Sequence, residues 1–341
     1  MEKTNGYKRA PSRFRNVIEE GGRFPPEIGM CFCSSDAFAW LKPGPALPQD
    51  RYHLYVSYAC PWASRTLIMR KLKGLDFIGV TIVSPRIGPD GWPFATLDDY
   101  PGAEPDPLYN SRLVKDLYLR ADPEYVGKYT VPLLWDKKQH TIVNNESADI
   151  VRMFNYAFNS YLPAHKAALD YYPPELRGEI DSLEAWMYDD INSAHAPPAS
   201  RTEALTLIRG SVTDGVYKVG FATTFSQYRD ALLPLFDALD RIEKMLSGKV
   251  YLVGNRLTEA DIRLYVTMVS RTAFYLVRVS ALTRGPFGMS DRWLRRLYWK
   301  HDAFQSTTDF QHIKTGYYSL KTMRTASPFV PIGPVPHIEP L

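Results

Sequence analysis

"RYHLYVSYACPWASRTLIMRKLKGLDFIGVTIVSP", residues 51–85, contains two strand-like runs on either side of a run with helical spacing. Aromatic and β-branched residues dominate 51–59, whereas apolar residues recur at helical spacing in 61–74, where Gly74 is a stop signal for a helix. A strand, a helix and a strand within about 35 residues predict a βαβ unit, which is normally right-handed with parallel strands.

The next segments complete an α/β domain. Residues 111–121 predict a short helix, 130–144 predict two strands joined by a turn at 136–139, and 146–158 predict another helix. The order βαβ and then ββα is that of a thioredoxin-like domain. After about residue 160 strand signals largely vanish, so the rest predicts an all-α domain. Its helical segments are 173–192, 224–247, 258–277 and 290–304.

These patterns predict four parts of the chain. We expect an extended lead-in over 1–48, a thioredoxin-like domain over 49–158, an all-α domain over 170–325 and a tail over 326–341.

One helix start in the all-α domain is well marked. In "LTEADI", residues 257–262, Thr258 can cap a helix, Asp261 can reach back to it, and the two flanking apolar residues have the spacing of a hydrophobic staple. We interpret this stretch as a folding signal.

The composition excludes several classes of protein. With 341 residues, a net charge of +4, 45% hydrophobic and 23% charged residues, the chain is typical of a globular protein with room for two domains. It has no long Lys/Arg run or basic aromatic stripe, no signal-like amino terminus and no apolar stretch of bilayer length. We therefore expect no nucleic-acid or membrane partner.

The three cysteines are too few and odd in number for a secreted disulfide framework, so we expect a cytoplasmic protein. Cys31 and Cys33 form a CxC pair that could bind metal. No second pair and no His cluster accompanies them in the sequence. We therefore expect no metal site.

Cys60 lies where the first strand is followed by a helix, with Pro61 directly after it. A helix amino terminus carries a positive partial charge and stabilises a thiolate, and such cysteines have pKa values of roughly 3.5–7.5. The motif is Cys-Pro-Trp-Ala and lacks the second cysteine of a CxxC pair. A site with one thiol must resolve its oxidised state with an external thiol. The motif alone leaves a packing cysteine equally open.

Two further segments favour a ligand-binding site. Pro132 begins a predicted strand at a place where thioredoxin-like folds often carry a cis proline, which would leave the backbone of Val131 available to an extended peptide. Glu146 and Ser147 begin a predicted helix, and helix amino termini bind carboxylates. Glu146 could pair with an α-amino group, so the two together suit a γ-glutamyl end. For Ser147 alone, a plain N-cap is the simpler interpretation.

From about Arg51 onward the chain resembles the glutathione transferases, and more narrowly the omega-like Xi class, the glutathionyl-hydroquinone reductases. Several of the shared motifs are long and rarely found in other transferase classes. They are "YVSYACPWAS" (55–64), "GWPF" (91–94), "DPLYNSRLVKDLYLRADPEYVGKYTVPLLWDKK" (106–138), "NNESADI" (144–150), "GVYKVGFAT" (215–223), "LTEADIRL" (257–264) and "DFQHIKTGYY" (309–318).

The resemblance implies a homodimeric glutathione-dependent reductase with glutathione as cosubstrate and no permanently bound cofactor. Cys60 would attack the sulfur of a glutathionyl-hydroquinone, release the hydroquinone and form a mixed disulfide, which a second glutathione would reduce. The partners implied are glutathione and a glutathionylated quinol or another aromatic electrophile. The implied glutathione site comprises Trp92, Lys128 (arginine in some members), Val131, Pro132, Glu146 and Ser147.

The resemblance also implies that tyrosines lie over the aromatic substrate, at Tyr217, Tyr275 and Tyr317. A phenol there could hydrogen-bond the quinol oxygen and assist proton delivery to the leaving carbon.

The sequence departs from the family pattern in places. Residues 193–214 look inserted, either as a true loop or as an unspliced piece of a gene model. Residues 270–272 and 319–327 also differ from the family on the side of the electrophile. Ser64 replaces a histidine that many members carry, so the cysteine motif holds no imidazole.

Two other functions remain open. An omega-like thiol transferase or dehydroascorbate reductase would use the same cysteine on other substrates. A non-catalytic transferase-like protein that binds glutathione conjugates would not need Cys60, which disfavours it.

Overall fold

A four-stranded mixed sheet forms the first part of the protein. The computed structural model describes residues 12–26, 51–187, 224–275, 288–319 and 338. The strands have the order β2-β1-β3-β4; β1 and β2 are parallel, and the other neighbours are antiparallel. This topology confirms the predicted thioredoxin-like domain. The strands are β1 (Tyr52–Val56), β2 (Gly79–Ile82), β3 (Leu133–Asp136) and β4 (Thr141–Asn144).

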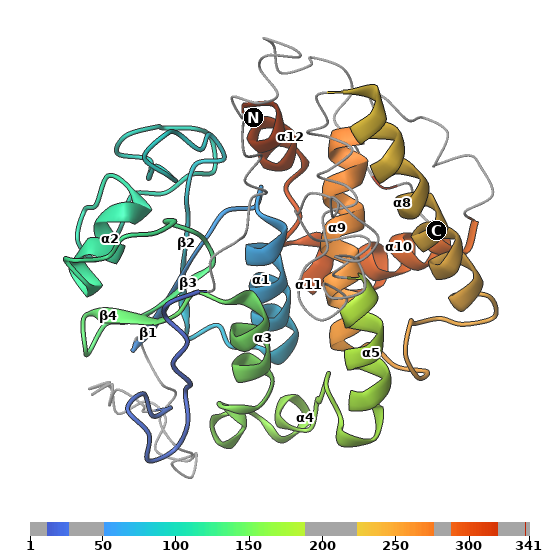
Figure 1. Ribbon diagram of the computed structural model, residues 1–341. Coiled ribbons are helices and arrows are strands. Elements are labelled where there is room, and N and C mark those ends of the chain that lie inside the picture. Colours follow the sequence, from blue (N-terminus) through green and yellow to red (C-terminus); the bar gives the residue numbers. More distant parts are fainter. Residues whose placement is uncertain (1–11, 27–50, 188–223, 276–287, 320–337, 339–341) are drawn as a thin grey trace, which may run out of the picture. The chain divides into compact units, whose positions relative to one another are not determined.

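Helices cover both faces of this sheet, which is why all five residues of the inner strand β1 are buried. Helices α1 (Pro61–Lys73) and α3 (Ser147–Tyr156) pack side by side on one face, and α2 (Val114–Ala121) lies on the other (Figure 1). At the end of α1, Gly74 has a φ of 71° and donates its N–H to carbonyls of the last turn. The predicted end of the helix at Gly74 is confirmed. Gly74 adopts the left-handed backbone conformation, which glycine takes up more readily than other residues.

The described residues after 160 contain helices and no strand, which confirms the predicted all-α region. Contacts within the chain define two compact units, one of Ser12–Asp170 with Ala303–Leu320 and one that includes Tyr171–Asp302. The remaining elements are η2 (Asn159–Tyr161), α4 (Ala164–Ala167), η3 (Pro174–Leu176), α5 (Arg177–Met187), α8 (Phe225–Met245), α9 (Glu259–Tyr275), α10 (Gly288–Lys300), α11 (Asp302–Gln305) and α12 (Phe310–Ser319). No described helix is both long and apolar enough to cross a bilayer.

The segment 290–304, predicted as one helix, is divided at His301 into α10 and α11. The imidazole Nε2 of His301 lies 3.2 Å from the hydroxyl of Tyr251, and Asp302 begins the next helix. Aspartate favours helix starts, which is consistent with the start of α11 at Asp302.

The carboxylate of Asp261 joins α9 to its surroundings from a fully buried position. It accepts hydrogen bonds from the backbone N–H groups of Thr258 and Leu252, both at 3.0 Å, and from the indole N–H of Trp293 on α10 at 2.9 Å. The predicted reach-back from Asp261 to Thr258 is confirmed. The Thr258 hydroxyl also donates to this carboxylate, so Asp261 organises a larger network than a capping box.

Burial raises the pKa of Asp261 from its ordinary value of 3.8 to about 6. The native state therefore binds a proton more tightly than the unfolded state, and this contribution to stability is lost as pH rises from about 4 to 6. We predict that the free energy of unfolding of the wild type, measured relative to Asp261→Asn, falls by up to about 3 kcal/mol over that range in urea titrations. If the difference in free energy of unfolding between the wild type and Asp261→Asn does not change with pH, the raised pKa of Asp261 is contradicted.

Candidate functional site

The thiol of Cys60 lies at the amino end of α1. Cys60 is the N-cap residue, with extended backbone angles (φ −97°, ψ 110°), and Pro61 is the first helical residue. Residue Cys60 is 9% exposed and is not part of a disulfide, and its thiol donates to the carbonyl oxygen of Val131 at 3.5 Å. The Val131–Pro132 peptide bond is cis, as expected from the sequence. The fold thus joins two residues 71 positions apart in one contact.

The helix end beside this thiol is electrostatically positive. The first turn of α1 contains no acidic residue, so nothing within that turn offsets the partial charge of its amino terminus. The hydroxyl of Ser64 donates to the carbonyl oxygen of Cys60 at 3.2 Å, a contact that does not reach the sulfur. The helix terminus is thus the feature of this turn that would favour a thiolate at Cys60.

Glu146 and Ser147 begin α3, and Glu146 is the residue that caps it. The Glu146 carboxylate accepts from the Ala148 N–H at 3.5 Å, and its carbonyl accepts from the Ile150 N–H at 3.0 Å. Ser147 is the first helical residue, so the interpretation of Ser147 as a plain N-cap is wrong. Its side chain is 2% exposed, and its hydroxyl oxygen has no hydrogen-bond partner among the described residues. A buried hydroxyl without a partner is costly, which marks it as available to a ligand.

Tyr118 of α2 connects the cis-proline loop with the start of α3. Its hydroxyl donates to the carbonyl of Thr130 at 2.9 Å and accepts from the side-chain amide of Asn145, also at 2.9 Å. Thr130 precedes Val131, and Asn145 precedes Glu146, so one buried hydroxyl holds both loops. The sequence predicted only that Tyr118 lies in the helix expected over 111–121, because its two partners are 12 and 27 residues away.

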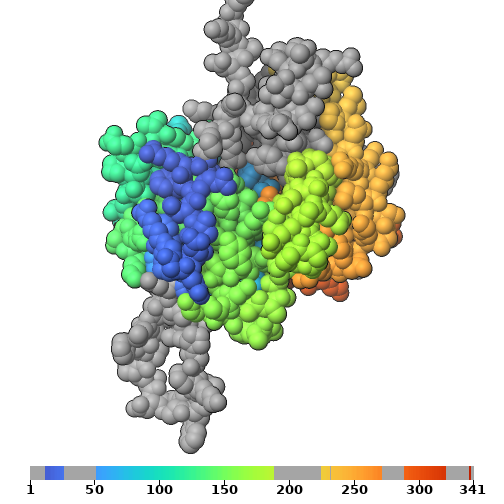
Figure 2. Space-filling model, turned by 60° about the horizontal axis from the view of Figure 1, so that its bottom comes forward, coloured from blue at the N-terminus to red at the C-terminus, as the bar shows by residue number. Residues whose placement is uncertain are grey.

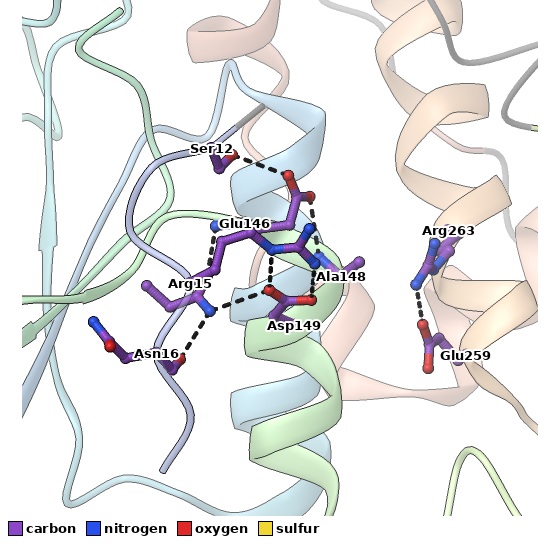
Figure 3. A network of polar contacts seen from close by, with 9 residues as sticks. Ser12, Arg15, Asn16, Glu146, Ala148, Asp149, Glu259 and Arg263 are labelled. Carbon is purple, nitrogen blue, oxygen red and sulfur yellow. Dashed lines mark hydrogen bonds and ion pairs between the residues drawn. The ribbon is translucent and has the colours of Figure 1, made fainter. Parts of the chain in front are cut away.

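The described part of the lead-in, residues 12–26, also contacts α3. The hydroxyl of Ser12 donates to the Glu146 carboxylate at 3.1 Å, and Arg15 pairs with Asp149 (Figure 3). Asn16 donates its N–H to the carbonyl of Val143 on β4 at 3.0 Å. Figure 2 shows residues 12–26, in deep blue, lying on the surface of this unit. The sequence predicted an extended lead-in but not the residues that it contacts.

Helix α12 returns to the same unit and packs close to Cys60. A Cβ on Gly316 would lie 2.4 Å from the Cβ of Ala59, so only glycine permits this approach. Tyr317 follows directly and is buried. On the residue before Gly316, the hydroxyl of Thr315 lies 2.7 Å from that of Tyr100. Tyr317 is therefore on a helix held against the residue before the thiol.

The other predicted site residues lie in different settings. Trp92 is half-buried, and its carbonyl accepts from the Val114 N–H at 2.9 Å. Lys128 is exposed, although partial burial lowers its pKa. Tyr275 is the last residue of α9, and its side chain is outside the described part of the structure. Tyr217, the tract 193–214, Cys31 and Cys33 also lie outside the described residues.

Sequence comparisons match both halves of the chain to glutathione transferases. Residues 59–156 match the family model of the glutathione S-transferase N-terminal domain, and 226–287 match that of the C-terminal domain. The glutathione S-transferase omega-like 2 of Schizosaccharomyces pombe is 46% identical, covering 85% of this chain and 88% of its own. The glutathionyl-hydroquinone reductase YqjG of Escherichia coli is 43% identical, covering 96% of this chain and 89% of its own.

Solved structures are similar over nearly the whole chain. The glutathione-S-transferase Xi of Phanerochaete chrysosporium has a TM-score of 0.81 and 49% identity, covering 98% of this chain and 100% of its own. The glutathione-bound structure of YqjG has a TM-score of 0.75 and 40% identity, covering 96% of this chain and 95% of its own.

The thioredoxin-like sheet, the helical region that follows it and both family models define a glutathione transferase. Within that class of enzymes, the chain belongs to the omega-like Xi family, the family of the glutathionyl-hydroquinone reductases.

Because the hydroxyl of Ser147 is buried without a partner, its removal relieves an unfavourable group. We predict that Ser147→Ala leaves the free energy of unfolding unchanged or raises it by about 1 kcal/mol in denaturant titrations. The control is Thr224→Ala, because the Thr224 hydroxyl caps α8 by accepting from the Gln227 N–H at 3.2 Å. That variant should lose about 1 kcal/mol. A comparable loss in Ser147→Ala would show that the serine acts as a structural cap.

Proposed function

We propose that the protein removes glutathione from glutathionyl-hydroquinones, with Cys60 as the attacking thiolate. The observation that carries this proposal is the Cys60 thiol at the amino end of α1, 3.5 Å from the Val131 carbonyl beside the cis peptide bond. A helix terminus favours the thiolate, which is the form that attacks sulfur. The 43% identity to a glutathionyl-hydroquinone reductase supports this class of substrate.

The proposed reaction has two displacements at sulfur. The Cys60 thiolate attacks the sulfur that joins glutathione to the aromatic ring and forms a disulfide with it. The carbon–sulfur bond breaks, its electron pair stays on the ring carbon, and that carbon takes up a proton to give the hydroquinone. The thiolate of a second glutathione then attacks the glutathionyl sulfur, which releases oxidised glutathione and restores the Cys60 thiolate. Glutathione supplies both reducing electrons.

The glutathione site in this proposal spans the cis-proline loop and the start of α3. The Val131 backbone would pair with the peptide, the Glu146 carboxylate would bind the α-amino group, and Ser147 with the helix terminus would bind the α-carboxylate. The buried hydroxyl of Ser147 supports this assignment, because a carboxylate would supply the partner that it lacks. The glutathione-bound relative supports glutathione as the ligand. Trp92 and Lys128 complete the site by family resemblance.

Tyr317 is the proposed source of the proton for the ring carbon. Its helix packs against Ala59 through Gly316, which supports a position near the reacting sulfur. Tyr217 and Tyr275 are proposed to bind the same aromatic substrate by family resemblance. An ordinary tyrosine remains protonated at neutral pH, so it can donate a hydrogen bond and deliver a proton in the transition state.

A steady-state assay with a glutathionyl-hydroquinone and glutathione tests this function. Cys60→Ser should release no hydroquinone above background, because a hydroxyl is not deprotonated by the helix terminus at neutral pH. Tyr317→Phe should lower kcat at least tenfold, as expected for loss of a general acid. The control is Tyr318→Phe, because Tyr318 is its neighbour on α12 and is equally buried. That variant should retain kcat within about twofold.

The same assay separates the proposal from its rival. A relative named omega-like at 46% identity favours an omega-like thiol transferase as the alternative. Turnover of small mixed disulfides with no release of hydroquinone by the wild type would favour that function. Retention of hydroquinone release in Cys60→Ser would contradict the proposed nucleophile.

A further inference from the structure

We propose that Arg15, in the lead-in segment, is a positioning residue of the glutathione site that neutralises Asp149 and so allows the start of α3 to accept the α-carboxylate of glutathione. This inference rests on the proposed function and assigns a role in it to residues 12–16. It concerns the electrostatics of the site, not the reaction at sulfur.

The starting point is a charge conflict within the first turn of α3. Asp149 is the third residue of this helix, two positions after Ser147. Although burial acts to raise its pKa, hydrogen bonds from Arg15 and Asn144 hold the pKa of Asp149 below its ordinary value, so it is charged at neutral pH. A ligand carboxylate at Ser147 would occupy the same positive helix end. Two negative groups would then share one terminus.

Arg15 offsets one of these charges with a bidentate pair. Its Nε lies 2.7 Å from Oδ2 of Asp149, and one terminal nitrogen lies 2.7 Å from Oδ1 (Figure 3). The side-chain amide of Asn144 donates to the same carboxylate at 3.2 Å. Parallel hydrogen bonds of this kind fix both the position and the charge of the pair.

The backbone of the segment holds Arg15 in this position. Asn145 donates its N–H to the carbonyl of Phe14 at 3.1 Å, and Asn16 donates its N–H to that of Val143 at 3.0 Å, so residues 14–16 pair with the end of β4. The ring of Phe14 packs edge-on against Tyr118, with centroids 5.9 Å apart. Ser12 then reaches the Glu146 carboxylate. The segment therefore contacts each side of the proposed γ-glutamyl site.

The pair has an effect beyond its contribution to folding. The side chains of Arg15 and Asp149 are 54% and 25% exposed, so solvent screens the contribution of this bidentate pair to stability without abolishing it. Arg15 also acts on a charged ligand in the same turn, because without it the ligand carboxylate would face an Asp149 charge that is offset less, by the Asn144 hydrogen bond and by Arg152. Removal of Arg15 should weaken glutathione binding about threefold to tenfold at low salt.

The test is a double-mutant cycle in which the dissociation constant of glutathione is measured by calorimetry on the full chain. Arg15→Gln should bind three- to tenfold more weakly than the wild type, and Asp149→Asn should bind as tightly or more tightly. The double variant should return to within about twofold of the wild type, because the charge that Arg15 compensates is gone. The defect of Arg15→Gln should shrink in high salt.

The control for net charge is Arg23→Gln. Arg23 belongs to the same segment but bonds the side chain of Gln139 at 3.2 Å, away from α3. It should bind glutathione as the wild type does.

Three results would overturn the inference. If the double variant binds as weakly as Arg15→Gln, Arg15 acts through docking of the segment and not through Asp149. If Arg15→Gln binds as tightly as the wild type, the pair has no effect on the ligand. If the folded wild type itself binds no glutathione, the proposed function fails together with this inference.

Discussion

The contact between the Cys60 thiol and the Val131 carbonyl is the constraint on which the rest of the site depends. It requires α1 to begin at Pro61, since only then does the thiol occupy the positive end of the helix. It also requires the cis-proline loop to return to that end of the sheet, where β3 pairs antiparallel with β1. A one-residue shift of either element would separate the thiol from the loop that is proposed to bind its substrate.

Around this contact, the protein uses buried polar groups to keep separate segments in register. Tyr118 joins the cis-proline loop to the start of α3, and Gly316 allows α12 to approach the residue before Cys60. Segment 12–16 adds a further layer against β4 and α3. Each of these contacts links segments that are distant in the sequence. The geometry of the site therefore depends on tertiary packing more than on any single sequence motif. Such fixed surroundings favour binding of an extended ligand with little loss of conformational entropy.

The sequence was sufficient to predict the helices and strands, and also the residues whose interactions are with near neighbours in the chain. Runs of aromatic and β-branched residues predicted the first strand, helical spacing predicted α1, and Pro61 and Gly74 predicted the ends of that helix. Contacts between residues far apart in the sequence could not be predicted in this way. Arg15 meets Asp149 across 134 positions, and nothing in the lead-in distinguishes this arginine from a solvated charge. Ser147 does not form the N-cap that its residue type alone predicts, because the boundary between β4 and α3 places Glu146 at that position.

The most direct measurement of the central claim is a single turnover without free glutathione. The folded protein is mixed with one equivalent of glutathionyl-hydroquinone, its intact mass is recorded, and its peptides are mapped. We predict one released hydroquinone per chain and one glutathionyl group on the Cys60 peptide, with none on the peptide that holds Cys31 and Cys33. Release of hydroquinone without this adduct, or an adduct confined to the other cysteines, would contradict the account.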